Sequence, residues 1–135
     1  MTEPNWIKVE VLIATQKEVV AEHGGIDGVR DMHLLESSCS APLQLYHYSN
    51  PKPSICELSA KYAYSLSRNH PFRDGNKRTA ALACELFLEL NDYTLMATDE
   101  EMYFIFIDLA AGKLKEAELI QWIQAHAVTH LYSSS

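Results

Sequence analysis

The sequence predicts an all-α fold in which about five or six helices pack around one central, buried helix, with at most a small β-hairpin or flap. Three observations lead to this prediction. Apolar residues recur at helical spacing along most of the chain. Two segments open with Ser or Thr followed three residues later by Glu, the signature of a capping box. Residues 76–90 are apolar on nearly every side, which is typical of a helix surrounded by others.

The first part of the chain is expected to hold one long and one short helix. Residues 5–22 place apolar side chains among charged ones, and the glycine pair that follows is a natural stop. Asp31 is a candidate N-cap for a short helix through Leu35. Across residues 42–53 the helical pattern is interrupted by proline, and apolar and polar side chains alternate. This segment is therefore expected to be a hairpin or an exposed loop.

The remainder predicts four further helices. Ser54 opens a capping box with Glu57, and helical spacing continues to about Asn69. The helix over residues 76–90 follows, and residues 93–97 are expected to be a short extended piece. Thr98 and Glu101 form a second capping box, which indicates the start of the next helix. A final amphipathic run with Leu119, Trp122 and Ile123 indicates the last one.

Length and composition limit the class of protein. A chain of 135 residues, 47% apolar, is expected to form a single domain over residues 1–130, with residues 131–135 as a disordered tail. No stretch approaches the ~20 apolar residues that span a membrane, and no secretory signal is visible, so the expected location is cytoplasmic. The odd number of cysteines, without a C-x-x-C pair, predicts buried free thiols in place of disulfides or a zinc site.

The charge is acidic overall but unevenly distributed. A net charge of −7 argues against direct binding of nucleic acid over a broad surface. Four cations nevertheless gather within eleven residues, namely Arg68, Arg73, Lys77 and Arg78. A local basic cluster on an acidic protein suits one small anionic ligand.

The link between the helices over residues 55–69 and 76–90 carries the candidate site, HPFRDGNKR. The first turn of a helix has unpaired N–H groups and a positive dipole end, so it attracts phosphate. Gly75 would let the backbone approach an anion closely. Lys77 and Arg78 add positive charge that is unfavourable at a helix N-terminus unless an anion is bound there.

Two further residues of this link suggest chemistry. Asp74 beside phosphate-binding groups suggests Mg²⁺, which commonly takes one or two carboxylates together with phosphate oxygens and water. His70 is a candidate base, because histidine accepts a proton near neutral pH and can activate a hydroxyl for attack on phosphorus. Phe72 is expected to be an inward anchor. Each residue alone has a structural alternative, such as an N-cap role for Asp74 or Asn76, and only their combination favours a site.

The segment HPFRDGNKR resembles the Fic-family signature H-x-F-x-D/E-G-N-x-x-R, and more closely its death-on-curing (Doc) branch, in which N-K-R follows the small residue. HGGIDGVRD with LLESS, and FLELNDYTL with AAGKLKEAELIQWI, are similar to other parts of Doc proteins. The resemblance implies a compact Fic/Doc-like helical bundle. By position it implies that His70 is the catalytic base and that Asp74 is a Mg²⁺ ligand. It also implies a site for the nucleotide phosphates, made by Gly75, Asn76, Lys77 and Arg78.

Two departures from the AMP-transferring pattern G-N-G-R-x-x-R bear on the chemistry. Lys77 stands in place of the second glycine and Ala81 in place of the second arginine. In the Doc branch this pattern goes with transfer of the γ-phosphoryl group of ATP to a Ser or Thr hydroxyl of a protein. Gly75 is the Fic-like choice where Doc often has alanine, so AMP transfer stays the alternative. A dead nucleotide-binding or interaction module is a third reading.

The resemblance also implies partners. It suggests a toxin that modifies a cytoplasmic protein, such as translation elongation factor Tu. No inhibitory string S/T-x-x-x-E-G/N occurs in the chain, and Ala81 removes the arginine that it would engage, so inhibition is expected from an antitoxin in trans. Residues 42–53 fall where the family has a target-binding flap, with Tyr46 and Tyr48 as candidate contacts.

Overall fold

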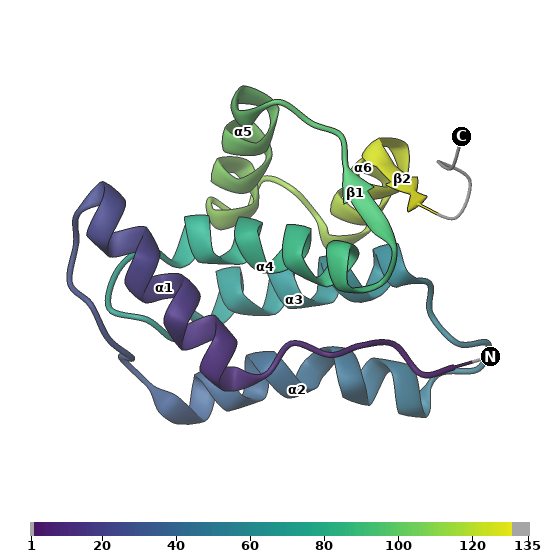
Figure 1. Ribbon diagram of the computed structural model, residues 1–135, viewed down its shortest axis with the longest axis horizontal. Coiled ribbons are helices and arrows are strands. Elements are labelled where there is room, and N and C mark those ends of the chain that lie inside the picture. The colour runs from purple at the N-terminus through teal and green to yellow at the C-terminus, as the bar shows by residue number, and fades with distance from the viewer. Residues whose placement is uncertain (1, 131–135) are drawn as a thin grey trace.

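The computed structural model describes residues 2–130, which form helices and two short strands (Figure 1). The predicted all-α fold with a small β element is confirmed, and the predicted tail, residues 131–135, lies outside the described residues. In chain order the elements are α1 (Val9–His23), α2 (Met32–Tyr48), α3 (Ile55–Asn69), α4 (Asn76–Leu90), β1 (Tyr93–Leu95), α5 (Asp99–Ala110), α6 (Glu116–His126) and β2 (Ala127–Thr129).

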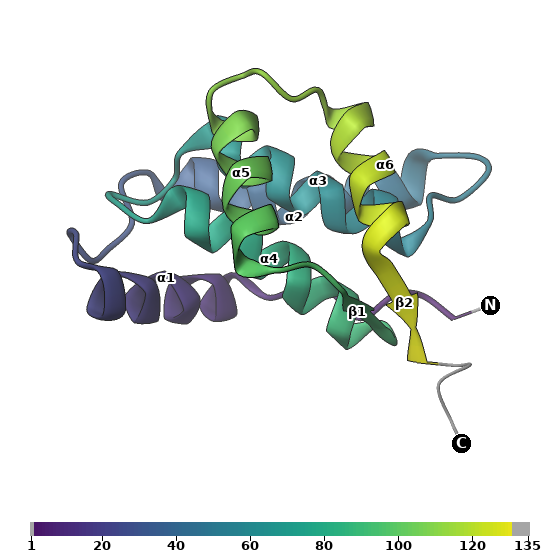
Figure 2. The ribbon, with the colours of Figure 1, turned by 90° about the horizontal axis from the view of Figure 1, so that it is seen from above.

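Helices α3 and α4 form the centre of the molecule and run antiparallel (Figures 1 and 2). Helix α2 and helix α6 pack on α3, whereas α1, α5 and β1 pack on α4. The predicted buried helix is therefore α4. Its core side chains are Ala80, Ala83, Cys84, Phe87 and Leu88, none more than 1% exposed. Leu82 and Leu90, at 42% and 40% exposed, show that α4 is not covered on every side.

The three N-caps expected from the sequence are confirmed. The Ser54 hydroxyl accepts the N–H of Glu57 at 3.1 Å, and the Glu57 carboxylate accepts the N–H of Ser54 at 2.9 Å. Thr98 and Glu101 make the same reciprocal pair at the start of α5. The Asp31 carboxylate accepts the N–H of Leu34 at 3.0 Å. These bonds satisfy donors that a helix start leaves unpaired.

The hairpin or loop expected over residues 42–53 is wrong for its first part, because α2 continues through Pro42 to Tyr48. A proline inside a helix removes a hydrogen bond and costs about 3 kcal/mol. Here Leu35, Cys39 and Pro42 are spaced by four and three residues and are all buried on the side that packs on α3. That packing overrides the proline penalty, and only residues 49–54 form a loop.

The helix expected over residues 5–22 begins later, at Val9. The segment before Val9 is extended and is held against the core by hydrogen bonds. The N–H of Ile7 donates to the Tyr62 hydroxyl at 3.1 Å. At the end of α4, Asn5 exchanges hydrogen bonds with Asn91, and its side-chain amide donates to the Leu90 carbonyl. The extended piece expected over residues 93–97 is confirmed for residues 93–95, which form β1 and pair antiparallel with β2.

The cysteines are free and buried, as expected. Burial raises the pKa of the Cys84 thiol to about 12, so this thiol is held in its protonated, inert form at neutral pH. Within residues 2–130, no helix is both long enough and apolar enough to cross a membrane.

Candidate active site

The candidate site lies where α3 ends and α4 begins, in the loop of residues 70–75, called here the motif loop. His70 follows α3 as its C-cap residue, with φ 47° and ψ 56° in the left-handed region, and Gly75 precedes α4 with φ 74°. Between them Phe72 is 1% exposed, which confirms the predicted inward anchor. The buried Phe72 thus anchors the middle of the loop in the core, while the side chain of His70, at the start of the loop, is exposed.

Asn76 organises the motif loop through its side chain. Its Oδ1 accepts the N–H of Phe72 at 3.0 Å, and its Nδ2 donates to the Phe72 carbonyl at 2.9 Å. The alternative N-cap roles for Asp74 and Asn76 are wrong, since the N-cap of α4 is Gly75 and no side chain caps it. Asn76 therefore offers a ligand its backbone N–H, while its amide is used to close the loop.

Among residues 2–130, the N–H groups and the cationic side chains of the first turn of α4 have no bonding partner, apart from the N–H of Thr79. The N–H of Thr79 bonds to the Gly75 carbonyl at 2.9 Å, but no described residue accepts the N–H of Asn76, Lys77 or Arg78. Lys77 and Arg78 are exposed and form no ion pair within the described part of the chain. Three free N–H groups, the positive end of the helix dipole and two free cations together form a site suited to phosphate.

His70 and Asp74 differ in how far they are engaged. The ring of His70 makes no hydrogen bond or ion pair with a residue in the range 2–130, so its nitrogens are free to act on a ligand. The half-buried Asp74 accepts the N–H of Ile26 through Oδ2 at 2.6 Å. Its Oδ1 has no hydrogen-bond partner among the described residues. Asp74 is therefore held in place by one carboxylate oxygen and can offer the other to a metal ion. A carboxylate oxygen next to a phosphate site is a suitable ligand for Mg²⁺.

The described residues contain no group of three or more His, Cys, Asp and Glu side chains that would hold a metal ion by themselves. Magnesium rarely needs such a cage, since it commonly keeps waters and takes substrate phosphates as ligands. Asp74 alone thus suits a metal that arrives with a nucleotide, and it does not suit a resident structural metal.

A second segment braces the motif loop from outside. Residues 24–31, called here the bracing segment, connect α1 to α2 and lie along the loop, where Val29 and Phe72 form an isolated antiparallel bridge. The N–H of Arg73 donates to the Gly28 carbonyl at 3.0 Å. The fully buried amide of Gln16 donates to the Asp74 carbonyl at 3.0 Å and accepts the N–H of Gly28 at 3.2 Å.

Sequence reasoning missed Gln16 and Arg30 as parts of the site. Gln16 lies on α1, 58 residues before Asp74, and nothing in its local sequence distinguishes it from a surface glutamine. Arg30 was noted within HGGIDGVRD, but no chemical use for it follows from that string.

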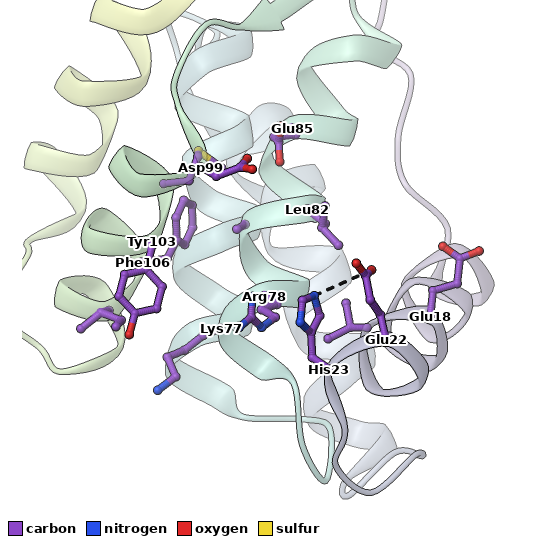
Figure 3. A pocket seen from close by; sticks show the side chains of 14 residues that line it. Glu18, Glu22, His23, Lys77, Arg78, Leu82, Glu85, Asp99, Tyr103 and Phe106 are labelled. Carbon is purple, nitrogen blue, oxygen red and sulfur yellow. Dashed lines mark ion pairs between the residues drawn. The ribbon is translucent and has the colours of Figure 1, made fainter.

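A cleft of about 740 Å³ opens beside the first turn of α4, between α1 and α5 (Figure 3). Lys77 and Arg78 line the part near the start of α4, whereas Glu85 and Asp99 lie at the other end (Figure 3). Burial, and then the neighbouring Asp99 and Glu89, raise the pKa of the Glu85 carboxyl. Apolar lining comes from Val19, Leu82, Met102 and Phe106. This volume lies within the range of small-molecule sites.

Tyr46 and Tyr48 are not brought to the motif loop. They end α2, beside the start of α3, while His70 ends α3, and the 15 residues of α3 span ~22 Å. Tyr46 packs edge-on against Trp6 at 5.6 Å, whereas Tyr48 is 88% exposed. A strand-like flap at these tyrosines is excluded by the helical backbone, so any contact with a target there would be remote from His70.

Comparisons with known proteins agree with the sequence motif. A model of the Fic/DOC family matches residues 6–88, more than half of the chain. The chain is 38% identical to "Toxin Doc" of Mycolicibacterium smegmatis over 74 residues, 55% of this chain and 57% of that protein. It is 27% identical to "Protein kinase doc" of Escherichia phage P1 over 129 residues, 96% of this chain and 97% of that protein.

The first of these matches spans little more than half of its relative, while the second spans nearly all of both chains. The family match includes the whole motif loop and the first turn of α4, whose free donors and cations are described above. The chain belongs to the Fic/DOC family.

Proposed function

We propose that this protein is a toxin-type phosphotransferase that moves the γ-phosphoryl group of ATP to a Ser or Thr hydroxyl of a protein. The observation that carries this proposal is the first turn of α4, where the described residues leave N–H groups and the cations Lys77 and Arg78 without partners, after a short loop that begins with the exposed His70. The names of the two relatives, a toxin and a protein kinase, support it.

The charges of the cleft suggest how a nucleotide would lie. Its phosphates would bind beside Lys77 and Arg78, the only lysine and arginine among the residues that line the cleft. Carboxylates line the rest of its charged surface, Glu18 and Glu22 on α1 and Glu85 and Asp99 at the other end, and they would repel polyphosphate. The neutral nucleoside would then lie against the apolar lining of the cleft. Asp74 would hold Mg²⁺ next to the phosphates, and the ion would supply charge neutralisation at the transferred group.

The proposed step moves one proton and one phosphoryl group. A ring nitrogen of His70 takes the proton of the target hydroxyl, and the hydroxyl oxygen forms a bond to the γ-phosphorus. The bond from that phosphorus to the oxygen bridging it to the β-phosphate breaks, and ADP leaves. Lys77, Arg78 and the N–H groups of the first turn of α4 would hold the phosphate charge through this step.

AMP transfer is the second candidate, and Gly75 is the observation in its favour. The structure offers another reason for this glycine. Its φ of 74° is in the left-handed region, and a Cβ there would lie 3.0 Å from Cγ1 of Val19 on α1. Because backbone geometry and packing against α1 both favour glycine here, Gly75 carries little weight for AMP transfer. Lys77 and Ala81 therefore support phosphoryl transfer as the first proposal.

The partners are proposed on the same basis. The target is a cytoplasmic protein, with elongation factor Tu as the first to test, and the toxin is inhibited by a separate antitoxin. Support comes from the relatives' names and from Ala81, which leaves no second arginine for an inhibitory glutamate on this chain.

Labelled ATP tests the reaction. Purified protein is incubated with cell lysate, or with elongation factor Tu, and with ATP labelled at either the α- or the γ-phosphate; the Mg²⁺ supply is varied. We expect γ-label, and no α-label, on protein, and only with Mg²⁺ present. Transfer of α-label would establish AMP transfer instead. No transfer of either label in the lysate, at any Mg²⁺ level, would contradict an enzyme of this kind.

A further inference from the structure

We propose that Arg30 is a positioning residue for His70. Its side chain fixes the end of α3, so that His70 keeps the left-handed backbone conformation from which its ring is presented at the motif loop. This inference deepens the proposed function, on which it rests, because it concerns the residue proposed as the base. Arg30 itself lies outside the motif, on the bracing segment.

Arg30 bonds to three successive carbonyl groups of the motif region. Its Nη2 donates to the carbonyl of Asn69 at 2.9 Å, and its Nε donates to the carbonyl of His70 at 2.7 Å. Its backbone N–H donates to the carbonyl of Pro71 at 2.7 Å. One residue, 40 positions before His70 in the chain, thus holds the backbone on both sides of the proposed base and at the base itself.

The chemistry of these bonds suits a guanidinium group. The last carbonyls of a helix have no partner within the helix, and the C-terminal end of the dipole favours a positive charge. The planar fork of arginine presents donors in a fixed geometry, which allows it to bond two neighbouring carbonyls at once. A lysine at this position would offer one compact ammonium and would not reproduce both bonds.

The conformation of His70 needs such support. With φ 47° and ψ 56°, it is one of two non-glycine residues with positive φ in the described chain, the other being Asp92. A side chain with a Cβ is disfavoured there, and such a conformation persists where the surroundings impose it. The N–H of His70 donates to the Leu66 carbonyl at 3.2 Å, and Arg30 holds the carbonyl on the other side.

Arg30 is itself well fixed, which makes it a useful reference point. The next residue, Asp31, donates its N–H to the Pro71 carbonyl at 3.1 Å and caps α2 through its carboxylate. The position of Arg30 is therefore tied to the start of α2. Through Arg30, the end of α3 is placed relative to a second helix.

The test compares Arg30→Ala, Arg30→Lys and a matched control, Arg68→Ala. Arg68 is also exposed and lies in the last turn of α3. The sequence grouped it with Lys77 and Arg78, but it does not line the cleft that those two residues line. Among the described residues, its guanidinium donates to the Tyr64 hydroxyl at 3.2 Å and lies over the Tyr64 ring. We expect Arg30→Ala to lower kcat by on the order of 10- to 100-fold, the scale of a small misplacement of a reacting group. The KM for ATP should change little, because the phosphate-binding groups lie on α4. Arg68→Ala should match the wild type.

Chemical rescue separates positioning from general stability. Free guanidinium ion, at a concentration too low to denature the protein, should restore part of the activity of Arg30→Ala, because the exposed site can admit it. It should not restore His70→Ala, and Arg30→Lys should be rescued less than Arg30→Ala because its side chain occupies the site. Loss of kcat in Arg30→Ala that guanidinium does not restore, together with an equal loss in Arg68→Ala, would overturn the proposal.

A readout that is independent of the reaction distinguishes failure of this inference from failure of the proposed function. The NMR backbone signals of His70, in protein labelled at histidine, report on its left-handed conformation whether or not the protein transfers phosphate. We expect them to move in Arg30→Ala and to stay in place in Arg68→Ala. If the wild type proves inactive, the proposed function fails, and unchanged His70 signals in Arg30→Ala would then refute the positioning role as well.

Discussion

Replacement of Gly75 by alanine tests the packing of the candidate site most sharply. Gly75 has φ 74°, which a residue with a Cβ adopts at a cost of about 1–2 kcal/mol. The added Cβ would also lie 3.0 Å from Cγ1 of Val19, which is only 4% exposed and has little room to move. Crowding of this kind typically costs a further ~1–3 kcal/mol. We therefore expect Gly75→Ala to lower the free energy of unfolding by about 2–5 kcal/mol.

Gly112→Ala is the matched control. Gly112 has φ 76°, but a Cβ built there has no neighbour within 4 Å. It should therefore lose only the backbone contribution, about 1–2 kcal/mol. The assay is urea unfolding of wild type and variants, with the slope m compared so that a change in stability is separated from a change in the unfolded state.

A third variant isolates the contact with α1. Combining Val19→Ala with Gly75→Ala removes the crowding, so the double variant should lose less stability than the sum of the two single variants. Equal losses in Gly75→Ala and Gly112→Ala, with additive behaviour of the double variant, would refute the packing argument. Such a result would also mean that packing does not explain the glycine, and Gly75 would then again favour AMP transfer.

Two other predictions concern the cleft and the biological role. Glu85→Gln should raise the free energy of unfolding at pH 7, because burial, and then Asp99 and Glu89, disfavour the ionised carboxylate. The like-charge pair with Glu89, one helical turn away, contributes about 0.2–0.5 kcal/mol of this gain. Since folding raises the pKa of Glu85, its ionisation costs stability as pH rises. The gain should therefore vanish in acid, where Glu85 is protonated in both the folded and the unfolded state. Expression of the wild-type protein should arrest cell growth, and expression of His70→Ala should not. Co-expression of an antitoxin encoded nearby should relieve the arrest. If the wild-type protein does not slow growth when expressed at a high level in its native host, the toxin role is contradicted.

Local signals in the sequence accounted for most of the helices. Ser54 with Glu57 and Thr98 with Glu101 mark helix starts because each pair satisfies backbone donors within four residues. The range 76–90 was predicted correctly because apolar periodicity and the preceding glycine are both local. Pro42 misled the prediction because its penalty is local, while the α3 surface that compensates for it is distant in the sequence.

In the candidate site too, local sequence features were predictable, whereas contacts between distant parts of the chain were not. The residues of the motif loop and of the first turn of α4 are contiguous, so their types and spacing were sufficient to propose a phosphate site. The residues that hold this loop, Gln16 and Arg30, act through bonds across 58 and 40 positions. Such bonds carry no pattern in a single sequence, and they became visible only when the bracing segment was placed against the loop.

The same holds for the tyrosines. Tyr46 and Tyr48 were associated with the site by analogy with a flap, but the length of α3 places them at its opposite end. Proximity in sequence to the motif gave no information about this separation, because the intervening helix is straight and runs away from the site (Figure 2).

The central claim is that His70 performs the chemistry while the first turn of α4 binds the nucleotide phosphates. Its most direct test measures ATP affinity and single-turnover transfer rate side by side for His70→Ala and for the double variant Lys77→Ala with Arg78→Ala. We expect His70→Ala to bind ATP nearly as the wild type does and to transfer on the order of 10²–10⁴-fold more slowly, and the double variant to bind ATP much more weakly. Full transfer activity in His70→Ala, or unchanged ATP affinity in the double variant, would contradict the account.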